Sequence, residues 1–530
     1  MVSNNRIAFG SCNEQDRQNK MWPIIEKRGP AAFIFGGDAI YGDYDLPTDW
    51  TKFLPETPHV CADPARLRNL YKKQKAVPGY KSLLKSNMTI FGSFDDHDYG
   101  CNNADKTFEH RYEAGLEFVE FLGQPADSPM SRRAQAGMGV YGVKLFDFAR
   151  PKGQQEVPDE EALIDPHVLD NGNATAVPVF PAYSNQSVAV FVLDVRSNKS
   201  PWKQGSAAYI PDFEGDMLGE DQWQWFEAAI SRSRAAVNVV VSGLQHHANI
   251  FPEPNIAESW TRFPSSQQRL FDAMLQDGVQ APILVSGDVH MSQLMRKDCA
   301  RIDGTSKQRR SLVEMTTSGM THSWGTVSSP PLSNPNEKPS LQERYKSFAA
   351  RVTMHVLHAV SPWTDLLVSQ PSTEEATAGL FPNGGGEGAK DGLQYSLEKN
   401  FGELEFDWEN RRVSMRSFGE TPGTPPLLMA SWTLDQLSGH DSIPGSVLTS
   451  QNFVDQANLH APRFTKNGGE WMCLAHRGTP SLFWQMAGHV STVGGLSILL
   501  PFPMLVPTLL LAMMFFRKPR TGLASSKRRI

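Results

Sequence analysis

The chain has 530 residues, of which 40% are hydrophobic and 20% are charged, a composition that is typical of a folded globular protein rather than a disordered one. Its formal net charge is −6, and its last fourteen residues hold six basic and no acidic side chains. The preceding residues therefore sum to −12, which argues against a nucleic-acid partner because such partners are bound by basic surfaces.

Short apolar runs that end in Gly or Asp alternate with longer helical patterns, which indicates an α/β layout. The pattern predicts strands at residues 6–10, 32–36, 89–94, 188–194, 237–243 and 282–288, and a hairpin at 400–418. It predicts helices at 66–77, 104–122, 219–234 and 265–277. Proline-rich or loop-like stretches predict insertions at about 148–187 and 328–395, the second partly helical at 341–358.

The C-terminal region predicts a membrane anchor. Residues 496–516 carry no charged side chain and the basic sequence RKPR follows at once, so we expect a transmembrane helix at 490–516, kinked by its prolines. A buried core helix is the alternative. The positive-inside rule would place the tail, 517–530, in the cytosol. The polar stretch 421–489 would then be a juxtamembrane stalk, and the body would be lumenal or extracellular.

Three sequons, at Asn87, Asn173 and Asn185, agree with such a glycoprotein topology. The N-terminal sequence MVSNNRIAFG does not resemble a signal peptide, so we expect that an upstream exon is missing.

The five cysteines cannot all pair within the chain, so at least one thiol must lack an intrachain partner. One or two intrachain disulfide bonds are possible.

Four predicted strands are followed at once by side chains that bind metals well. These side chains are Cys12; Asp38 and Tyr41; Asp95, Asp96 and His97; and Asp288 and His290. Residues at the ends of strands converge on one edge of a sheet, where α/β proteins place their sites. The alternative is four unrelated polar turns. His246, His247 and His322 also follow strands or turns, but we do not predict them as ligands.

The motifs FGSCN, GGDAIYGD, DDHDYGCNN, LDVRSNKSP, MLGEDQWQW and SGDVH, in this order, resemble the PhoD-type alkaline phosphatases. This family is a branch of the calcineurin-like metallophosphoesterases. The resemblance covers residues 6–320, and NFGELEFDW at 400–408 is similar to the closing hairpin of the family. The insertion at 328–395 and the expected anchor look closest to long, membrane-anchored eukaryotic forms. The resemblance implies a two-sheet β-sandwich flanked by helices over residues 1–420, with a metal cluster at the strand ends.

The resemblance also implies a ligand set and a cofactor pair. The ferric-iron ligands would be Cys12, Asp38, Tyr41, Asp288 and His290. Thiolate, imidazole and phenolate suit such a transition metal. Asp38 would bridge to a second metal, for which Asp95 and Asp96 supply carboxylates. A carboxylate at Asp96 favours a hard ion such as calcium, although other divalent metals could replace either ion.

The remaining two candidates would act on the substrate. A metal-activated hydroxide would attack the phosphate ester, and His97 would protonate the leaving group or stabilise the transition state. A capping or core histidine is the alternative. Arg196 would clamp the phosphate, because a guanidinium pairs with two phosphate oxygens; a structural ion pair is the alternative.

The sequence therefore predicts a metal-dependent phosphomonoesterase, phosphodiesterase or both. A catalytically idle, membrane-anchored binding protein with a structural metal site is the competing hypothesis. A redox role for a Cys- and Tyr-ligated iron is a third and weaker possibility.

Overall fold

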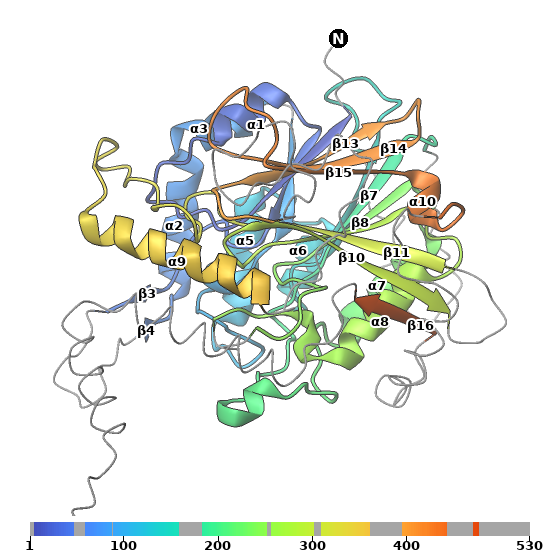
Figure 1. Cartoon of the computed structure of the whole chain (residues 1–530), viewed down its shortest axis with the longest axis horizontal. Coiled ribbons are helices and arrows are strands. Elements are labelled where there is room, and N and C mark those ends of the chain that lie inside the picture. The colour runs from blue at the N-terminus through green and yellow to red at the C-terminus, as the bar shows by residue number, and fades with distance from the viewer. Residues whose placement is uncertain are drawn as a thin grey trace, which may run out of the picture.

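The protein is described by a computed structural model at residues 5–46, 59–86, 88–157, 183–251, 256–301, 309–360, 395–442 and 470–475. Two β-sheets lie face to face in this structure, with helices on either side of the pair (Figure 1). The expected α/β class and two-sheet arrangement are confirmed.

The first sheet has six strands in the order β15-β14-β13-β1-β2-β5. Its strands are β1 (Arg6–Gly10), β2 (Ala32–Gly36), β5 (Thr89–Ser93), β13 (Phe401–Asp407), β14 (Arg412–Phe418) and β15 (Leu428–Thr433). Strands β1, β2 and β5 pair in parallel, so their carboxyl ends lie at one edge. The predicted hairpin is β13 and β14.

The second sheet has eight strands in the order β12-β10-β11-β9-β8-β7-β6, with β16 also paired to β10. Its strands are β6 (Gly142–Asp147), β7 (Ser187–Val192), β8 (Val237–Val241), β9 (Pro282–Ser286), β10 (Ser292–Arg301), β11 (Arg309–Thr317), β12 (Tyr395–Ser396) and β16 (Trp471–Ala475). Strands β7, β8, β9 and β11 pair in parallel. A separate two-stranded ribbon joins β3 (Tyr44–Asp45) to β4 (His59–Val60).

The helices form two groups and several short connections. On the side of the first sheet lie α1 (Trp22–Arg28), α2 (Pro64–Ala76), α3 (Pro78–Leu84), α5 (Arg111–Leu122) and α6 (Pro129–Gln135). On the side of the second sheet lie α7 (Glu220–Arg232) and α8 (Pro264–Leu275). The remaining helical elements are α4 (Asp96–Tyr99), α9 (Leu341–Val360), α10 (Leu434–Ser438), η2 (Gly205–Tyr209) and η3 (Trp260–Arg262).

Alternation along the strands divides the core into two layers, because successive side chains of a strand point to opposite faces. In β7, Val188, Val190 and Val192 join the cluster between the two sheets. Ala189 and Phe191 instead join the cluster beneath α7 and α8. Both faces of this strand are therefore buried, which explains its continuous apolar sequence.

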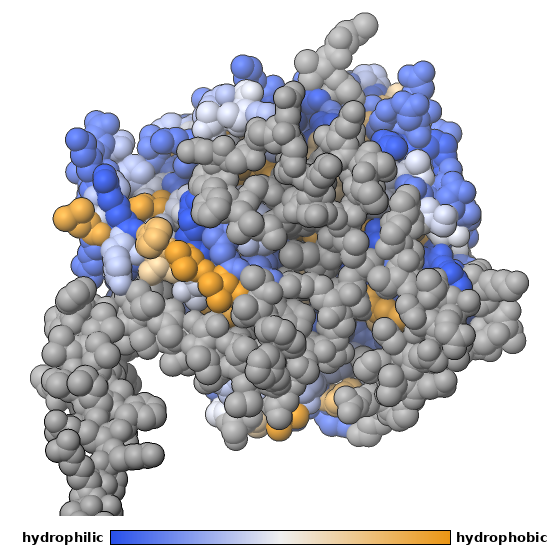
Figure 2. All heavy atoms as spheres, viewed as in Figure 1, coloured by the Kyte–Doolittle hydropathy of each residue, from blue (hydrophilic) through white to orange (hydrophobic). Residues whose placement is uncertain are grey.

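Helix α9 lies in the predicted insertion and packs against the rest of the protein with one of its faces. Met354, Leu357 and His358 are buried. The opposite face exposes the large side chains of Leu341, Tyr345, Phe348, Val352 and Val356. Figure 2 shows an orange diagonal where Figure 1 draws α9.

The prediction of a juxtamembrane stalk at 421–489 is wrong for the residues that the structure describes there, 421–442 and 470–475. Strand β15 pairs with β14 in the first sheet, and β16 pairs with β10 in the second. The prediction missed these strands because both are short and lie at either end of a longer polar stretch. The other domain boundaries stay predictions.

The expectation of a single-pass membrane protein is contradicted. Across the described ranges, no helix is both long and apolar enough to span a bilayer. The longest, α9, has 20 residues but carries charged side chains on its first turns. The segment 490–516, on which the expectation rested, lies outside the described residues, as does the tail. The lumenal or extracellular placement of the body rested on the same segment.

The two sheets are in close contact at the carboxyl ends of their parallel strands. A Cβ atom added to Gly287, directly after β9, would collide with the Gly36 carbonyl oxygen and the Ser11 side chain from the first sheet. The absence of a side chain at Gly287 therefore permits this contact between the ends of β1, β2 and β9.

We expect Gly287→Ala to lower the free energy of unfolding by about 1–3 kcal/mol, the usual cost of overpacking a tight interior. Gly115→Ala is the matched control, because a Cβ at Gly115 in helix α5 meets only ordinary van der Waals contacts. Chemical denaturation of both variants measures the difference. Equal stability of the two variants would show that the sheets do not need this close approach.

Candidate metal centre

The predicted ligands lie in loops that begin where the parallel strands end. Four of them adopt left-handed backbone conformations: Cys12 (φ 56°), Asp38 (φ 50°), Asp288 (φ 65°) and His290 (φ 52°). Such values are uncommon for residues other than glycine, and they persist where the surrounding structure enforces them, often at functional sites. The fold therefore holds these four side chains in place against a local conformational cost.

One set of donor atoms gathers around Cys12. The Cys12 Sγ lies 3.3 Å from Asp38 Oδ2, and Asp38 Oδ2 lies 3.4 Å from the Tyr41 Oη. The Tyr41 Oη in turn lies 3.3 Å from His290 Nε2. Donor atoms that share one cation at about 2.1 Å in tetrahedral geometry are themselves about 3.4 Å apart. These spacings are therefore compatible with a shared cation.

His322 joins this set, although the sequence did not identify it as a ligand. Its Nε2 lies 2.9 Å from Tyr41 Oη and 3.3 Å from His290 Nε2. Burial holds the pKa of His322 well below its usual value, which keeps the imidazole neutral and able to donate a lone pair. We call Cys12, Asp38, Tyr41, His290 and His322 the Cys12 group.

A second set consists of carboxylates alone. Oxygen atoms of Asp95, Asp96 and Asp288 all lie within 4.8 Å of one another. The resemblance assigned Asp288 to the iron ligands, whereas the structure places its carboxylate with these oxygens. We call these three residues the Asp96 group. Both Asp96 oxygens accept backbone N–H bonds, from His97 at 2.9 Å and from Asn103 at 2.7 Å, and these bonds fix its orientation.

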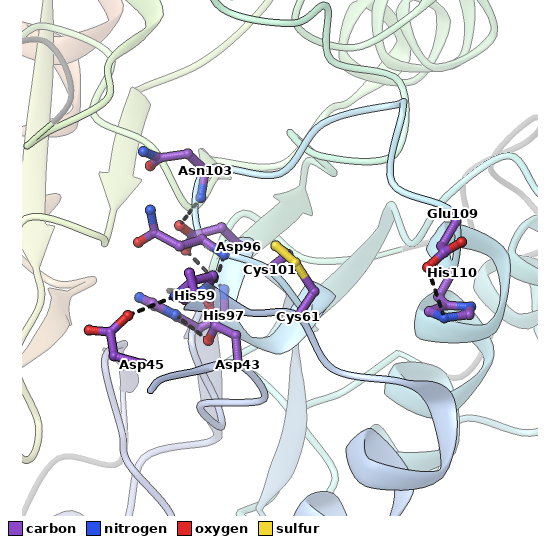
Figure 3. The surroundings of a disulfide bond; sticks show 11 residues. Asp43, Asp45, His59, Cys61, Asp96, His97, Cys101, Asn103, Glu109 and His110 are labelled. Atoms are coloured by element: carbon purple, nitrogen blue, oxygen red, sulfur yellow. Dashed lines mark hydrogen bonds and ion pairs between the residues drawn. A yellow bond between two sulfur atoms is a disulfide. The ribbon is translucent and has the colours of Figure 1, made fainter. Parts of the chain in front are cut away.

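His97 lies between the two groups and belongs to a chain of hydrogen bonds (Figure 3). Its Nδ1 lies 2.7 Å from Asp43 Oδ1, and the other Asp43 oxygen lies 2.7 Å from His59 Nε2. The His97 ring also stacks on Tyr41 at 4.2 Å. Burial lowers the pKa of His97, but Asp96, Asp38 and Asp43 outweigh burial and hold it well above its usual value.

A disulfide bond joins Cys61, next to β4, to Cys101 in the loop that follows His97 (Figure 3). The backbone N–H of the next residue, Asn102, donates to Asp43 Oδ2 at 2.7 Å. A second disulfide joins Cys299 to Cys473. The cysteine without a disulfide partner is thus Cys12.

Arg196 is fully buried, and its guanidinium lies among carboxylates. Its Nε donates to Asp95 Oδ1 at 2.5 Å, and a terminal nitrogen lies 2.7 Å from Glu258 Oε2. This is the structural ion pair that the sequence left open as an alternative. In this position Arg196 orients Asp95, and the phosphate-clamp hypothesis stays a prediction.

His246 and His247 lie in a different environment from the two groups. Their backbone N–H groups donate to the buried Glu314 at 2.9 Å and 2.7 Å. Burial lowers the pKa of His247 to about 3, so this side chain is a neutral core histidine.

Residues 184–356 match the family model of the PhoD-like phosphatases. This match confirms the resemblance to the PhoD-like phosphatases over these residues. Among solved structures, one titled "Structure of PhoD" has 14% sequence identity and a TM-score of 0.47, and the alignment covers 87% of this chain and 77% of that one. A search of the curated proteins gives no match.

The donor atoms of the Cys12 and Asp96 groups fit bound cations. Within the described part of the chain, Asp38 Oδ1 and Asp95 Oδ2 are buried and have no hydrogen-bond partner, a costly state that a metal ion would relieve. Burial raises the pKa of Asp38 well above its usual range. Burial also raises the pKa of Asp95 to about 7, even though Arg196 opposes the shift. A nearby cation would reverse these shifts by favouring the charged forms.

We expect the stability that bound metal adds to the protein to grow as the pH rises from about 4 to about 7. A carboxyl group whose pKa is higher in the folded than in the unfolded protein binds more protons when folded, so ionisation favours unfolding. The upper limit follows from the pKa of Asp95, about 7. Thermal unfolding across this range, measured in chelator and again with saturating metal, gives this difference. Identical pH dependence with and without metal would contradict the assignment of these carboxylates to a cation site.

Proposed function

We propose that this protein hydrolyses phosphate esters with metal ions held by the Cys12 and Asp96 groups. The observation that carries the proposal is that Asp96, His97, Asp288 and His290 line one cavity, so both groups and a proton donor face the same space. The PhoD-like family match supports the same reaction class.

The chemistry of the two groups suggests different ions. A thiolate, a phenolate and two imidazoles favour a transition metal such as ferric iron, whereas three carboxylates favour a hard ion such as calcium. When bound, such ions would neutralise the phosphoryl oxygens and activate a water molecule.

The residues of the chain supply the proton and its position. Hydrolysis adds water to phosphorus and breaks one P–O ester bond, and the leaving oxygen then needs a proton. His97 lines the cavity, and the Asp43 carboxylate bonded to its Nδ1 favours the protonated imidazole that can donate that proton. Asp43 binds the His97 Nδ1, which leaves Nε2 as the donor to substrate.

The test separates proton donation from metal binding. His97→Ala should keep the metal content and lose turnover of alkyl phosphates by about 10²–10⁴-fold, the usual contribution of general acid catalysis. The loss should be smaller for nitrophenyl phosphates, whose leaving group needs little protonation. Asp96→Ala should lose metal and turnover together. Elemental analysis and steady-state kinetics on a monoester and a diester measure both properties.

His110→Ala is the matched control, because His110 pairs with Glu109 away from His97 (Figure 3). It should retain metal and turnover. A His97→Ala protein that loses its metal would make His97 a ligand instead. A wild-type protein that binds metal but hydrolyses neither ester would favour the idle binding protein.

A further inference from the structure

The cavity beside the metal centre has a large apolar portion. Its volume is about 130 Å³, and besides the polar residues named above its lining includes Phe251, Ile256, Val289, Met291, Trp324 and Met354. We call these six residues the apolar wall. Several belong to a small hydrophobic cluster separate from the two main cores. A group attached to the reacting phosphate could therefore contact the carbon atoms of this wall, although Asn102, Asn103 and Glu258 also line the cavity.

The apolar wall is held in place by contacts with the site itself. The Trp324 Nε1 donates to the Val289 carbonyl at 2.8 Å, and the Trp324 ring lies 6.1 Å from the His290 ring. Met354 comes from α9, which is anchored because Arg351 Nε donates to the Gly325 carbonyl at 2.9 Å. The wall is therefore preformed, as binding sites for small molecules usually are.

The charge of the cavity disfavours a substrate with a second anionic group. Among its described lining residues there is no lysine or arginine, and the lining includes Glu258 besides the metal-binding carboxylates. The nearby cations Arg196 and Lys199 are fully buried, and both lie against Glu258, at 2.7 Å and 3.7 Å. A further phosphate or carboxylate of the substrate would meet Glu258 and would find no lysine or arginine in this lining to pair with it.

From these observations we propose that the apolar wall binds the alcohol portion of the substrate. The substrate class is then a phosphate ester of a small apolar alcohol, alkyl or aryl, and not a sugar phosphate or a nucleotide. The size of the cavity agrees, because about 130 Å³ is well below the roughly 300–1,000 Å³ of sites for drug-sized ligands. The inference rests on the proposed phosphoesterase function.

The test compares esters that differ only in the group facing the wall. Methyl, ethyl, propyl and butyl phosphate have leaving groups of similar basicity, so kcat/KM should rise about fourfold for each methylene group buried, until the cavity is filled. The esters 4-hydroxybutyl phosphate and adenosine monophosphate should be poor substrates. Their kcat/KM should be at least about tenfold lower than that of butyl phosphate.

The variant Met354→Gln keeps the length of the side chain and places an amide in the wall. It should lower the ratio of kcat/KM for butyl phosphate to that for methyl phosphate by at least about fourfold. Phe348→Gln makes a comparable change on the exposed face of the same helix and should leave the ratio unchanged. Calorimetry with butylphosphonate, which cannot be hydrolysed, should show tighter binding than methylphosphonate, and Met354→Gln should reduce that difference.

The outcomes separate the two proposals. Hydrolysis of none of the esters would overturn the phosphoesterase function and this inference with it. Hydrolysis of all alkyl esters at equal kcat/KM, or a preference for 4-hydroxybutyl phosphate or adenosine monophosphate, would overturn the apolar specificity alone. A ratio that falls equally in the Met354 and Phe348 variants would also overturn it.

Discussion

The compensation of buried negative charge is the constraint on which this structure depends. Asp38, Asp95, Asp96 and Asp98 are buried close together where the two sheets meet, and the Arg196 guanidinium lies against Asp95 and Asp96. Burying unpaired carboxylates is costly, so they either take up protons or bind cations. One arginine and one histidine do not balance four carboxylates near neutral pH. Bound metal ions would supply the missing positive charge, and the same ions would then be available to bind a phosphate ester.

The two-sheet architecture explains why these residues can be gathered at all. Parallel strands of both sheets end at one place, and each following loop adds one or two donor atoms to it. The close approach at Gly287 and the left-handed backbones at Cys12 and Asp288 are local costs, which the large core on either side can tolerate. The insertion that contains α9 adds a different property, because Met354 gives the cavity an apolar boundary that the strand ends do not provide.

Much of the site could be predicted because its residues directly follow recognisable strands. Cys12, Asp38 and His290 each follow an apolar run by a few residues, and convergence at one sheet edge followed from parallel pairing. His322 was not recognised because it lies in an irregular loop, where no periodicity indicates which way a side chain points. The burial of Arg196 depends on contacts with Asp95 and Glu258, which are distant in sequence. The stalk was predicted wrongly because β15 and β16 are short strands at either end of a longer polar stretch, and the partner of β16, β10, lies far away along the chain.

Anomalous X-ray diffraction from crystals of the purified protein tests the central claim most directly. At the absorption edge of iron, or of another transition metal found by elemental analysis, we expect a peak within bonding distance of the Cys12 Sγ and the His290 Nε2. A second density peak among the oxygens of Asp95, Asp96 and Asp288 is expected for the hard ion. Well-ordered density without any peak at either position, with the carboxyl groups hydrogen-bonded to one another, would contradict the account.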